Sequence, residues 1–217
     1  SPADTQTLVV DTTAPEVNSV TASTTDGSYK LNDVIDIQVI FGEQVSITGS
    51  PRLTLETGDN DRLATYVSGA SGFVHIFRYT VQAGDTTSDL DYKATNSLDL
   101  NGGSITDSYS NSANLTLPSP GNSNSLSDSK ALVIDTTAPS ISAALAVNAT
   151  NTSATITFSE AVFKSDGSTR LTATELVPTI ASGTATLTSY TVSTTDDTTF
   201  TFALTLSGTS DGAEVLT

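Results

Sequence analysis

Two octapeptides in the 217-residue chain are identical at all positions but one, and this repeat constrains the fold more than any other feature. Residues 8–15 read Leu-Val-Val-Asp-Thr-Thr-Ala-Pro, and residues 132–139, 124 positions later, read Leu-Val-Ile-Asp-Thr-Thr-Ala-Pro. A repeat at the length of one domain indicates a tandem array. Each copy joins a short apolar run, typical of a strand, to a proline that keeps the residue before it extended. The sequence therefore predicts domains connected by short, stiff Asp-Thr-Thr-Ala-Pro linkers.

The repeat divides the chain into one whole domain and parts of two others. Residues 1–11 are interpreted as the last strand of a preceding repeat, and residues 12–135 as a complete repeat. Residues 136–217 are interpreted as a second repeat that is incomplete at its C-terminus and lacks its last two strands. In this interpretation the chain is a fragment of a longer array. A partial domain of this kind would have an open sheet edge with unpaired backbone groups.

Alternating hydrophobicity predicts an all-β chain. Apolar and polar side chains alternate with a period of two over residues 34–41 and 73–82, as expected of half-buried strands. Seven or so short strands in about 120 residues, separated by turns that contain Gly and Asp, are typical of an antiparallel immunoglobulin-like Greek-key β-sandwich. The other strands are expected at residues 16–23, 52–56, 63–67 and 131–134, from residue 90 onward, and at 113–117 as an extra strand.

Two side chains are assigned structural roles on the basis of this pattern. Tyr92 lies where the tyrosine corner of a sandwich would be, and its hydroxyl is expected to bond to loop backbone. His75 lies on the inward face of its strand and is expected to be a hydrogen-bonded core residue. Asp85, Asp89 and Asp91 are close in sequence, but no cleft, nucleophile or Gly-rich phosphate loop accompanies them. The sequence therefore predicts that the protein is not an enzyme.

The charge of the chain excludes several classes of partner. It has 24 acidic and 8 basic residues, and a formal net charge of −16. Nucleic acids and anionic membranes are excluded, because phosphate binding requires clustered Lys and Arg. No apolar run is long enough to insert into a membrane. An acidic surface is compatible with divalent cations, and also with a surface that is merely soluble.

Acidic residues are predicted to gather at the joints between domains. In immunoglobulin topology the loop after the second strand lies beside the linker that enters the domain. This places Glu43 near Asp11 in one repeat and Glu160 near Asp135 in the next, and the loop before the last strand adds Asp107 and Asn111 to the first group. Loops of the complete repeat place four more acids on the other side of the second joint: Asp26, Asp33, Asp85 and Asp89. The predicted metal ligands are Asp11, Glu43, Asp107, Asp135, Glu160, Asp26, Asp85 and Asp89.

Calcium is the cation that suits these residues best. Carboxylates gathered without Lys or Arg among them repel one another, and a hard cation relieves that repulsion. Ca²⁺ accepts six to eight oxygen ligands in irregular geometry, whereas Mg²⁺ requires a tighter octahedron. Zinc would require His or Cys, and the chain has one His and no Cys. The structural alternatives are that Asp11 and Asp135 form Asx turns at strand ends and that Glu43 and Glu160 are solvated.

The repeated motifs resemble those of a known family. Val-Asp-Thr-Thr-Ala-Pro, together with Phe-Gly-Glu-Gln-Val at 41–45 and Phe-Ser-Glu-Ala-Val at 158–162, resembles tandem bacterial immunoglobulin-like (cadherin-like) domains of large surface adhesins and biofilm-associated proteins. The resemblance covers most of residues 1–135 and is looser over 140–217. It implies an extracellular, non-enzymatic role at the bacterial cell surface, with Ca²⁺ stiffening the joints. Gly42 replaces the usual Ser before the Glu, and the turn that begins at Asp107 departs from the usual Asp-Ala-Ala-Gly-Asn.

Three functions are compatible with these observations. The first is a spacer or stalk segment of a repetitive surface adhesin, whose partners are the neighbouring repeats of the same chain. The second is a structural subunit of an extracellular filament or sheath, in which identical chains donate strands to one another. The third is a carbohydrate-binding or accessory module of a secreted enzyme, which would present an exposed aromatic platform.

Overall fold

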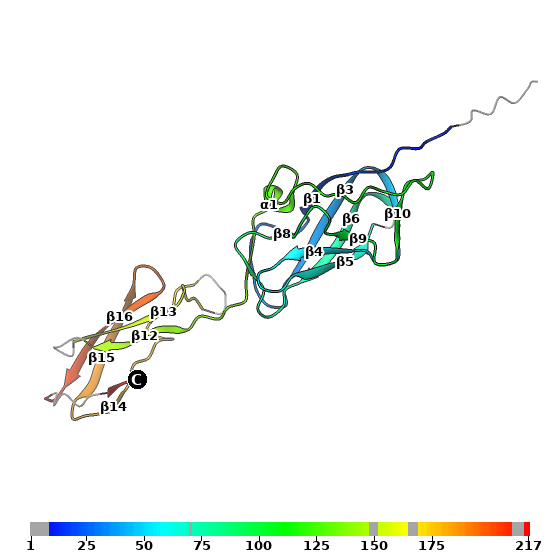
Figure 1. Ribbon diagram of the computed structural model, residues 1–217. Helices are drawn as coiled ribbons and strands as arrows, with labels where there is room; N and C mark the ends of the chain where they lie inside the picture. Colours follow the sequence, from blue (N-terminus) through cyan, green and yellow to red (C-terminus); the bar gives the residue numbers. More distant parts are fainter. Residues whose placement is uncertain (1–8, 70, 148–151, 165–168, 210–214) are drawn as a thin grey trace, which may run out of the picture. The chain divides into compact units, whose positions relative to one another are not determined.

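The fold is built almost entirely from β-strands (Figure 1). The computed structural model describes residues 9–69, 71–147, 152–164, 169–209 and 215–217. Within these residues the one helix is α1 (Leu126–Ser129), so the predicted all-β class is confirmed. No helix in the described part of the chain is long and apolar enough to cross a bilayer. The chain divides into two compact units, Ser1–Thr137 (unit 1) and Ala138–Thr217 (unit 2).

Unit 1 is organised around one curled antiparallel sheet of eight strands. Six strands follow one another across it in the order β1-β3-β6-β5-β4-β8, while β10 pairs with the end of β3 and β9 pairs with β4. The strands are β1 (Val17–Ala22), β3 (Val34–Thr48), β6 (Ser71–Thr80), β5 (Arg62–Ser68), β4 (Arg52–Glu56), β8 (Asp91–Tyr92), β9 (Leu98–Asp99) and β10 (Ser104–Thr106).

The repeated apolar run at 132–135 forms the middle strand of a second, small sheet in unit 1. This strand, β11 (Leu132–Asp135), pairs in parallel with β2 (Gly27–Tyr29) and antiparallel with β7 (Thr86–Thr87). Its Leu132 and Ile134 are fully buried, whereas Val133 between them is half-buried. The strand thus contributes alternate side chains to the core of unit 1, as the period of a strand requires.

Strand β3 supplies the centre of that core. Ile35, Ile37, Val39 and Phe41 are buried and alternate with less buried residues, so the predicted period of two is confirmed. The strand does not end near residue 41, as expected, but continues to Thr48 through a register shift between Ile40 and Val45. The sequence prediction missed this because a bulge inserts extra residues and interrupts the alternation.

The predicted extra strand at 113–117 is wrong. This segment makes one isolated bridge, between Glu16 and Asn114, and a second bridge joins Thr106 to Ser112 just before it. It nevertheless packs on the core through Leu117, which is buried. The Tyr92 hydroxyl donates a 2.6 Å hydrogen bond to the Pro118 carbonyl oxygen, so its predicted bond to loop backbone is confirmed.

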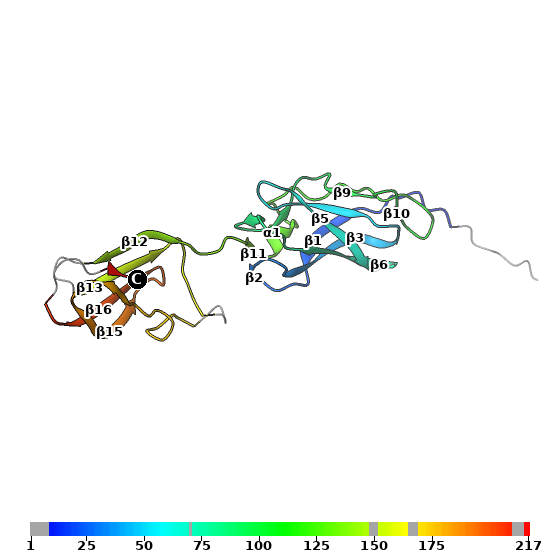
Figure 2. The same cartoon turned by 90° about the horizontal axis from the view of Figure 1, so that it is seen from below.

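Unit 2 has the same order of strands, but they are divided between two sheets (Figure 2). Its four-stranded sheet runs β12-β13-β16-β15, and a separate pair joins β14 to β17. The strand β17 was not expected, because the sequence predicted that the last two strands of this repeat were missing. The bounds are β12 (Ile141–Val147), β13 (Ser153–Phe158), β14 (Ile180–Ser182), β15 (Thr186–Thr194), β16 (Thr199–Ser207) and β17 (Val215–Leu216).

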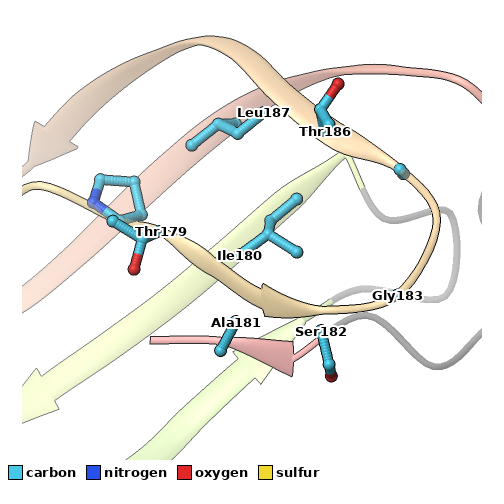
Figure 3. Close-up of a pocket in the computed structure, with 9 residues that line it drawn as sticks. Thr179, Ile180, Ala181, Ser182, Gly183, Thr186 and Leu187 are labelled. Carbon is cyan, nitrogen blue, oxygen red and sulfur yellow. The ribbon is translucent and has the colours of Figure 1, made fainter.

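The two units differ at one seam of the sheet. In unit 1 β4 pairs with β5, and this joins the fourth and fifth strands of the order into one sheet. The corresponding strands of unit 2, β14 and β15, do not pair with each other among the described residues. A pocket lies between them instead, with Ile180 and Leu187 among its lining residues (Figure 3).

Candidate metal centre

Three carboxylates from distant parts of the sequence converge at one end of unit 1. Asp11, Glu43 and Asp107 each offer one carboxylate oxygen, and these oxygens lie within 4.8 Å of one another. Asp11 belongs to the linker before β1, Glu43 to the bulge in β3, and Asp107 to the turn after β10. Asp107 is buried and the other two are half-buried. The structure thus places together the group that the sequence predicted for the first joint.

Hydrogen bonds within its own turn favour the ionised form of the Asp107 carboxylate. Its Oδ1 accepts hydrogen bonds from the backbone N–H groups of Tyr109 and Asn111, both at 2.8 Å. Its Oδ2 accepts a 2.7 Å bond from the Asn111 side-chain amide. Burial by itself would raise the pKa of Asp107, but the hydrogen bonds from Asn111, Tyr109 and Ser110 outweigh it and lower the pKa.

Asn111 also connects this turn to the linker. Its side-chain amide nitrogen donates a second hydrogen bond, of 3.1 Å, to the backbone carbonyl oxygen of Asp11. One amide group therefore orients the Asp107 carboxylate and the linker backbone together. The sequence analysis placed Asn111 beside this group, and these two bonds define its role there.

Asp11 and Glu43 keep oxygen atoms that protein groups do not use. The Oδ1 of Asp11 accepts a 2.9 Å bond from the Thr13 N–H, as an Asx turn does, which leaves its Oδ2 available. The Glu43 side chain makes no hydrogen bond or ion pair with any residue that the structure describes. The turn and the acidic group therefore use different atoms of Asp11 and are compatible with each other.

The electrostatics of the group favour a hard cation. Among the described residues, no Lys, Arg or His forms an ion pair with Asp11, Glu43 or Asp107. The donors are all carboxylate oxygens, which Ca²⁺ accepts, whereas zinc prefers nitrogen and sulfur ligands. Three carboxylates supply part of the six to eight ligands of Ca²⁺, and water can supply the others. The residues present therefore fit a calcium ion.

The second joint repeats parts of this arrangement. The Oδ1 of Asp135 accepts a 2.9 Å bond from the Thr137 N–H, as Asp11 does from Thr13. In unit 2 the Ser159 N–H donates to the Ser140 carbonyl at 2.7 Å, and in unit 1 the Gly42 N–H donates to the Glu16 carbonyl at 2.9 Å. Glu160 is therefore the residue directly after the donor Ser159, as Glu43 is the residue directly after the donor Gly42. Within the described residues, however, the only group of three or more possible ligands is the one at Asp11.

Asp85 has a structural role that differs from the predicted one. It is fully buried, and its Oδ1 accepts a 2.6 Å bond from the Arg62 guanidinium. Its Oδ2 accepts bonds from the Tyr79 hydroxyl at 2.6 Å and from the Gln82 N–H at 2.8 Å. Both oxygens already have protein partners, one of which is a cation, so Asp85 is an internal anchor of unit 1.

Asp26 and Asp89 hold the start of β11. Asp26 accepts a 3.2 Å bond from the Ala131 N–H and lies 3.8 Å from the Lys130 ammonium group. Asp89 accepts a 3.2 Å bond from the Leu132 N–H. The expectation that no Lys or Arg accompanies the acids at this joint is therefore wrong. The sequence pattern could not show these ion pairs, because Arg62 approaches Asp85 and Lys130 approaches Asp26 only in the folded chain.

The sequence analysis did not foresee the role of Thr136 in the second linker. Its hydroxyl donates a 2.9 Å bond to the Asp85 carbonyl oxygen and accepts a 3.0 Å bond from the Gly84 N–H. These bonds attach the linker to the turn that follows β6. The Thr-Thr pair that both octapeptides share was the feature of the sequence that could have indicated this role.

His75 is a core residue, as predicted. It is fully buried, its Nε2 lies 3.0 Å from the Gly72 carbonyl oxygen, and its ring packs against the edge of Phe41. It belongs to no group of possible metal ligands among the described residues.

Comparison of the chain with protein-family models, with curated proteins and with solved structures finds no match.

Proposed function

We propose that this chain is a spacer segment of a repetitive bacterial surface adhesin, in which Ca²⁺ stiffens the joints between immunoglobulin-like repeats. The observation that carries the proposal is the position of the acidic group. Asp11 belongs to the repeated linker, whereas Glu43 and Asp107 belong to the body of the domain that follows. An ion bound by all three would fix the linker to the domain and remove the freedom of the joint.

The strand order supports the immunoglobulin-like part of the proposal. In such sandwiches the first, second, fifth and fourth strands form one sheet, and the third, sixth and seventh form the other. Unit 2 divides in this way, with β12-β13-β16-β15 in one sheet and β14-β17 in the other. Unit 1 has the same order, but β4 and β5 join the two sheets at one seam. In both units, linkers of the Asp-Thr-Thr-Ala-Pro type precede the first strand.

The expected affinity is that of an extracellular calcium module. Such modules bind with a Kd of about 10⁻⁴ to 10⁻³ M. At a free Ca²⁺ concentration of one hundred times Kd, binding to the folded state alone adds about 2.7 kcal/mol to the free energy of unfolding. This increase is a large part of the free energy of unfolding of a typical domain, which is about 5–15 kcal/mol.

Thermal unfolding with and without Ca²⁺ tests the proposal, together with titration calorimetry of the same samples. We expect Ca²⁺ to raise the Tm of unit 1, and Glu43→Gln to weaken calcium binding about tenfold or more by removing one charged ligand. Glu56→Gln is the matched control, because Glu56 is exposed and lies outside the acidic group.

The joint itself is tested by small-angle scattering in Ca²⁺ and in a chelator, on a chain extended at its N-terminus by one further repeat. Bound Ca²⁺ should make the particle longer and narrow its range of conformations. An unchanged Tm with no heat of binding would contradict the calcium site. Binding without any change in scattering would leave the site but contradict its role in stiffening.

A further inference from the structure

The one histidine of the chain is enclosed at the end of the sheet of unit 1 where β3 is bulged. His75 is fully buried in β6. It pairs with Val39 of β3, one position before the regular pairing of the two strands stops at Ile40 and Val74. Its ring meets Phe41 edge-on, with the ring centroids 5.7 Å apart. The imidazole therefore lies directly beside the bulge and is cut off from solvent.

One ring nitrogen connects the imidazole to the strand beyond the bulge. Nε2 lies 3.0 Å from the Gly72 carbonyl oxygen, which can only accept a hydrogen bond, so Nε2 carries the proton of the neutral ring and donates it. Gly72 pairs with Val45, where the pairing of β3 with β6 resumes after the bulge. The hydrogen bond thus holds the segment that follows the turn between β5 and β6.

The other ring nitrogen is buried without a partner. Nδ1 accepts no hydrogen bond from any residue that the structure describes, and the buried hydroxyl of Tyr66 in β5 has no partner there either. The two rings are neighbours, with centroids 6.3 Å apart. The backbone of the turn closes over Nδ1, because a Cβ at Gly69 would lie only 3.3 Å from it. A second proton on the imidazole would therefore place a positive charge under this turn, away from water.

The charged groups around the ring do not compensate for such a proton. On β5 the titratable group beside the imidazole is Tyr66. On β3 the bulge carries Glu43, and on β6 the one charged residue is Arg78, which is exposed and paired with Asp36. None of these groups contributes to the shift in the pKa of His75.

The shift has a definite sign. Burial lowers the pKa of His75 below its ordinary value of 6.5, and the backbone groups of Gly72 and Gly69 oppose burial only in part. The unfolded chain takes up a proton near pH 6.5, whereas folded unit 1 does so only at lower pH. The stability that depends on neutral His75 is therefore fully present above pH 6.5 and is lost as pH falls toward the pKa of the folded state.

We infer that His75 is a pH-sensitive switch, whose protonation in mild acid opens the turn between β5 and β6 and the adjoining bulge of β3. The opening is local, because the imidazole lies at the end of the regular β3–β6 pairing, and such ends open at a lower cost than the whole domain. The inference does not rest on the calcium proposal, since His75 is not a member of the acidic group.

Hydrogen exchange of the whole chain in a chelator, followed from about pH 7 to about pH 5, tests the inference. Ordinary Asp and Glu side chains stay largely ionised over this range. After correction for the intrinsic pH dependence of exchange, the equilibrium constant for opening of segments 39–45 and 71–75 should rise by up to about tenfold per pH unit below 6.5. The pair of Val34 and Thr80, at the other end of the same two strands, should change much less.

Two substitutions separate the imidazole from its surroundings. His75→Gln is neutral at every pH in this range and keeps an amide that can donate to the Gly72 carbonyl, so it should remove the pH dependence. Tyr66→Phe is the matched control, because it removes the other unpartnered polar atom beside the turn and leaves the imidazole in place. This variant should keep the pH dependence of the natural chain.

An NMR titration of the natural chain is a second measurement that does not require a variant to fold. Because the chain has one histidine, its imidazole signals need no assignment. We expect the Nε2–H tautomer in the folded protein and a pKa below 6.5. A pKa of 6.5 or above, or the Nδ1–H tautomer, would overturn the inference. So would equal loss of protection at both ends of β3 and β6, pH dependence that persists in His75→Gln, or its loss in Tyr66→Phe.

Discussion

Unit 1 and unit 2 follow the same order of strands and differ in how completely they are closed. In unit 1 β4 pairs with β5, and β11 contributes two buried side chains to the core. In unit 2 the corresponding β14 and β15 do not pair with each other among the described residues, and an apolar hollow remains at Ile156 and Phe202. The comparison shows that the same strand order can be packed to different degrees. The degree of packing depends on the side chains that fill the space between the strands.

The units also differ in how they hold charge. Unit 1 contains a fully buried carboxylate, Asp85, which is satisfied by Arg62, Tyr79 and Gln82. The described part of unit 2 has two ion pairs: Lys164–Glu175, with both side chains about one third exposed, and Arg170–Asp197, in which a buried carboxylate meets an exposed guanidinium. The buried carboxylate of unit 1 is therefore enclosed by several protein groups, whereas the ion-pair partner of the buried carboxylate of unit 2 remains exposed to solvent.

The largest expected effect comes from truncating an equivalent aromatic residue in each unit. Phe77 in β6 pairs with Ile37, and Phe202 in β16 pairs with Ala154, which places them at the same point of the strand order. We expect Phe77→Ala to cost about 3–5 kcal/mol, as in a close-packed core. Phe202→Ala should cost less, because Phe202 lines the hollow and already lacks some neighbours.

Hydrogen exchange during urea unfolding, resolved by unit, measures the two costs separately. Equal costs for Phe77→Ala and Phe202→Ala would show that unit 2 is as well packed as unit 1, and the comparison would then fail.

A second difference should appear at alkaline pH. Burial, the bond to Asp85 and the charge of Asp85 raise the pKa of Tyr79, and burial and the charge of Asp91 raise the pKa of Tyr92. Above about pH 10 the unfolded chain loses the phenolic protons that the folded chain keeps. The free energy of unfolding of unit 1 should therefore fall as pH rises, by about 1.4 kcal/mol per pH unit for each tyrosine.

Thermal melts from about pH 9 to about pH 11 measure this loss. Tyr92→Phe should reduce the slope by the share of one tyrosine, although it also removes the bond to Pro118. A stability of unit 1 that does not change over this range would contradict the prediction.

The smallest expected effect concerns unit 2 in acid. The Lys164 ammonium and the Thr172 hydroxyl and N–H hydrogen-bond Glu175 and, despite partial burial, lower its pKa to about 2 from 4.5. This contribution is present above pH 4.5 and is lost as pH falls toward 2. Glu175→Gln should therefore lower the Tm of unit 2 slightly at neutral pH and have less effect near pH 2. The effect is small because solvent screens the pair.

Glu160→Gln is the control for this substitution, since Glu160 makes no ion pair with any residue that the structure describes. If both variants lowered the Tm of unit 2 equally, the loss would come from net charge and not from the Lys164 contact.

The strands with strong alternation were the most predictable part of the fold. Residues 34–41, 52–56 and 73–80 lie in β3, β4 and β6, because period-two burial is a local property that a sequence displays directly. The prediction failed where pairing interrupts the period, as at the bulge that contains Glu43. It also failed at 113–117, where Leu117 is buried but makes no ladder.

Among the acidic residues too, the sequence predicted the positions of some and did not indicate the contacts of others. The repeated linker and the repeated Phe-x-Glu motif were sufficient to predict that Asp11 and Glu43 lie near each other, and the expected position of the loop before the last strand added Asp107. No pattern in the sequence indicated that Asp85 is enclosed by Arg62 and Tyr79, because these three residues come from different strands and turns. Their contact depends on the register between β5 and β6 and on the turn after β6.

The sequence by itself determined the all-β class and the position of strand β11, because alternating hydrophobicity is a property of neighbouring residues. The tertiary structure decided which copy of the repeated apolar run forms a buried strand, since residues 9–11 form none, and which acids remain available to a cation. Burial and ion pairing depend on surfaces that meet only after folding. Ile134 and Val10 therefore have nearly the same local sequence and opposite exposures.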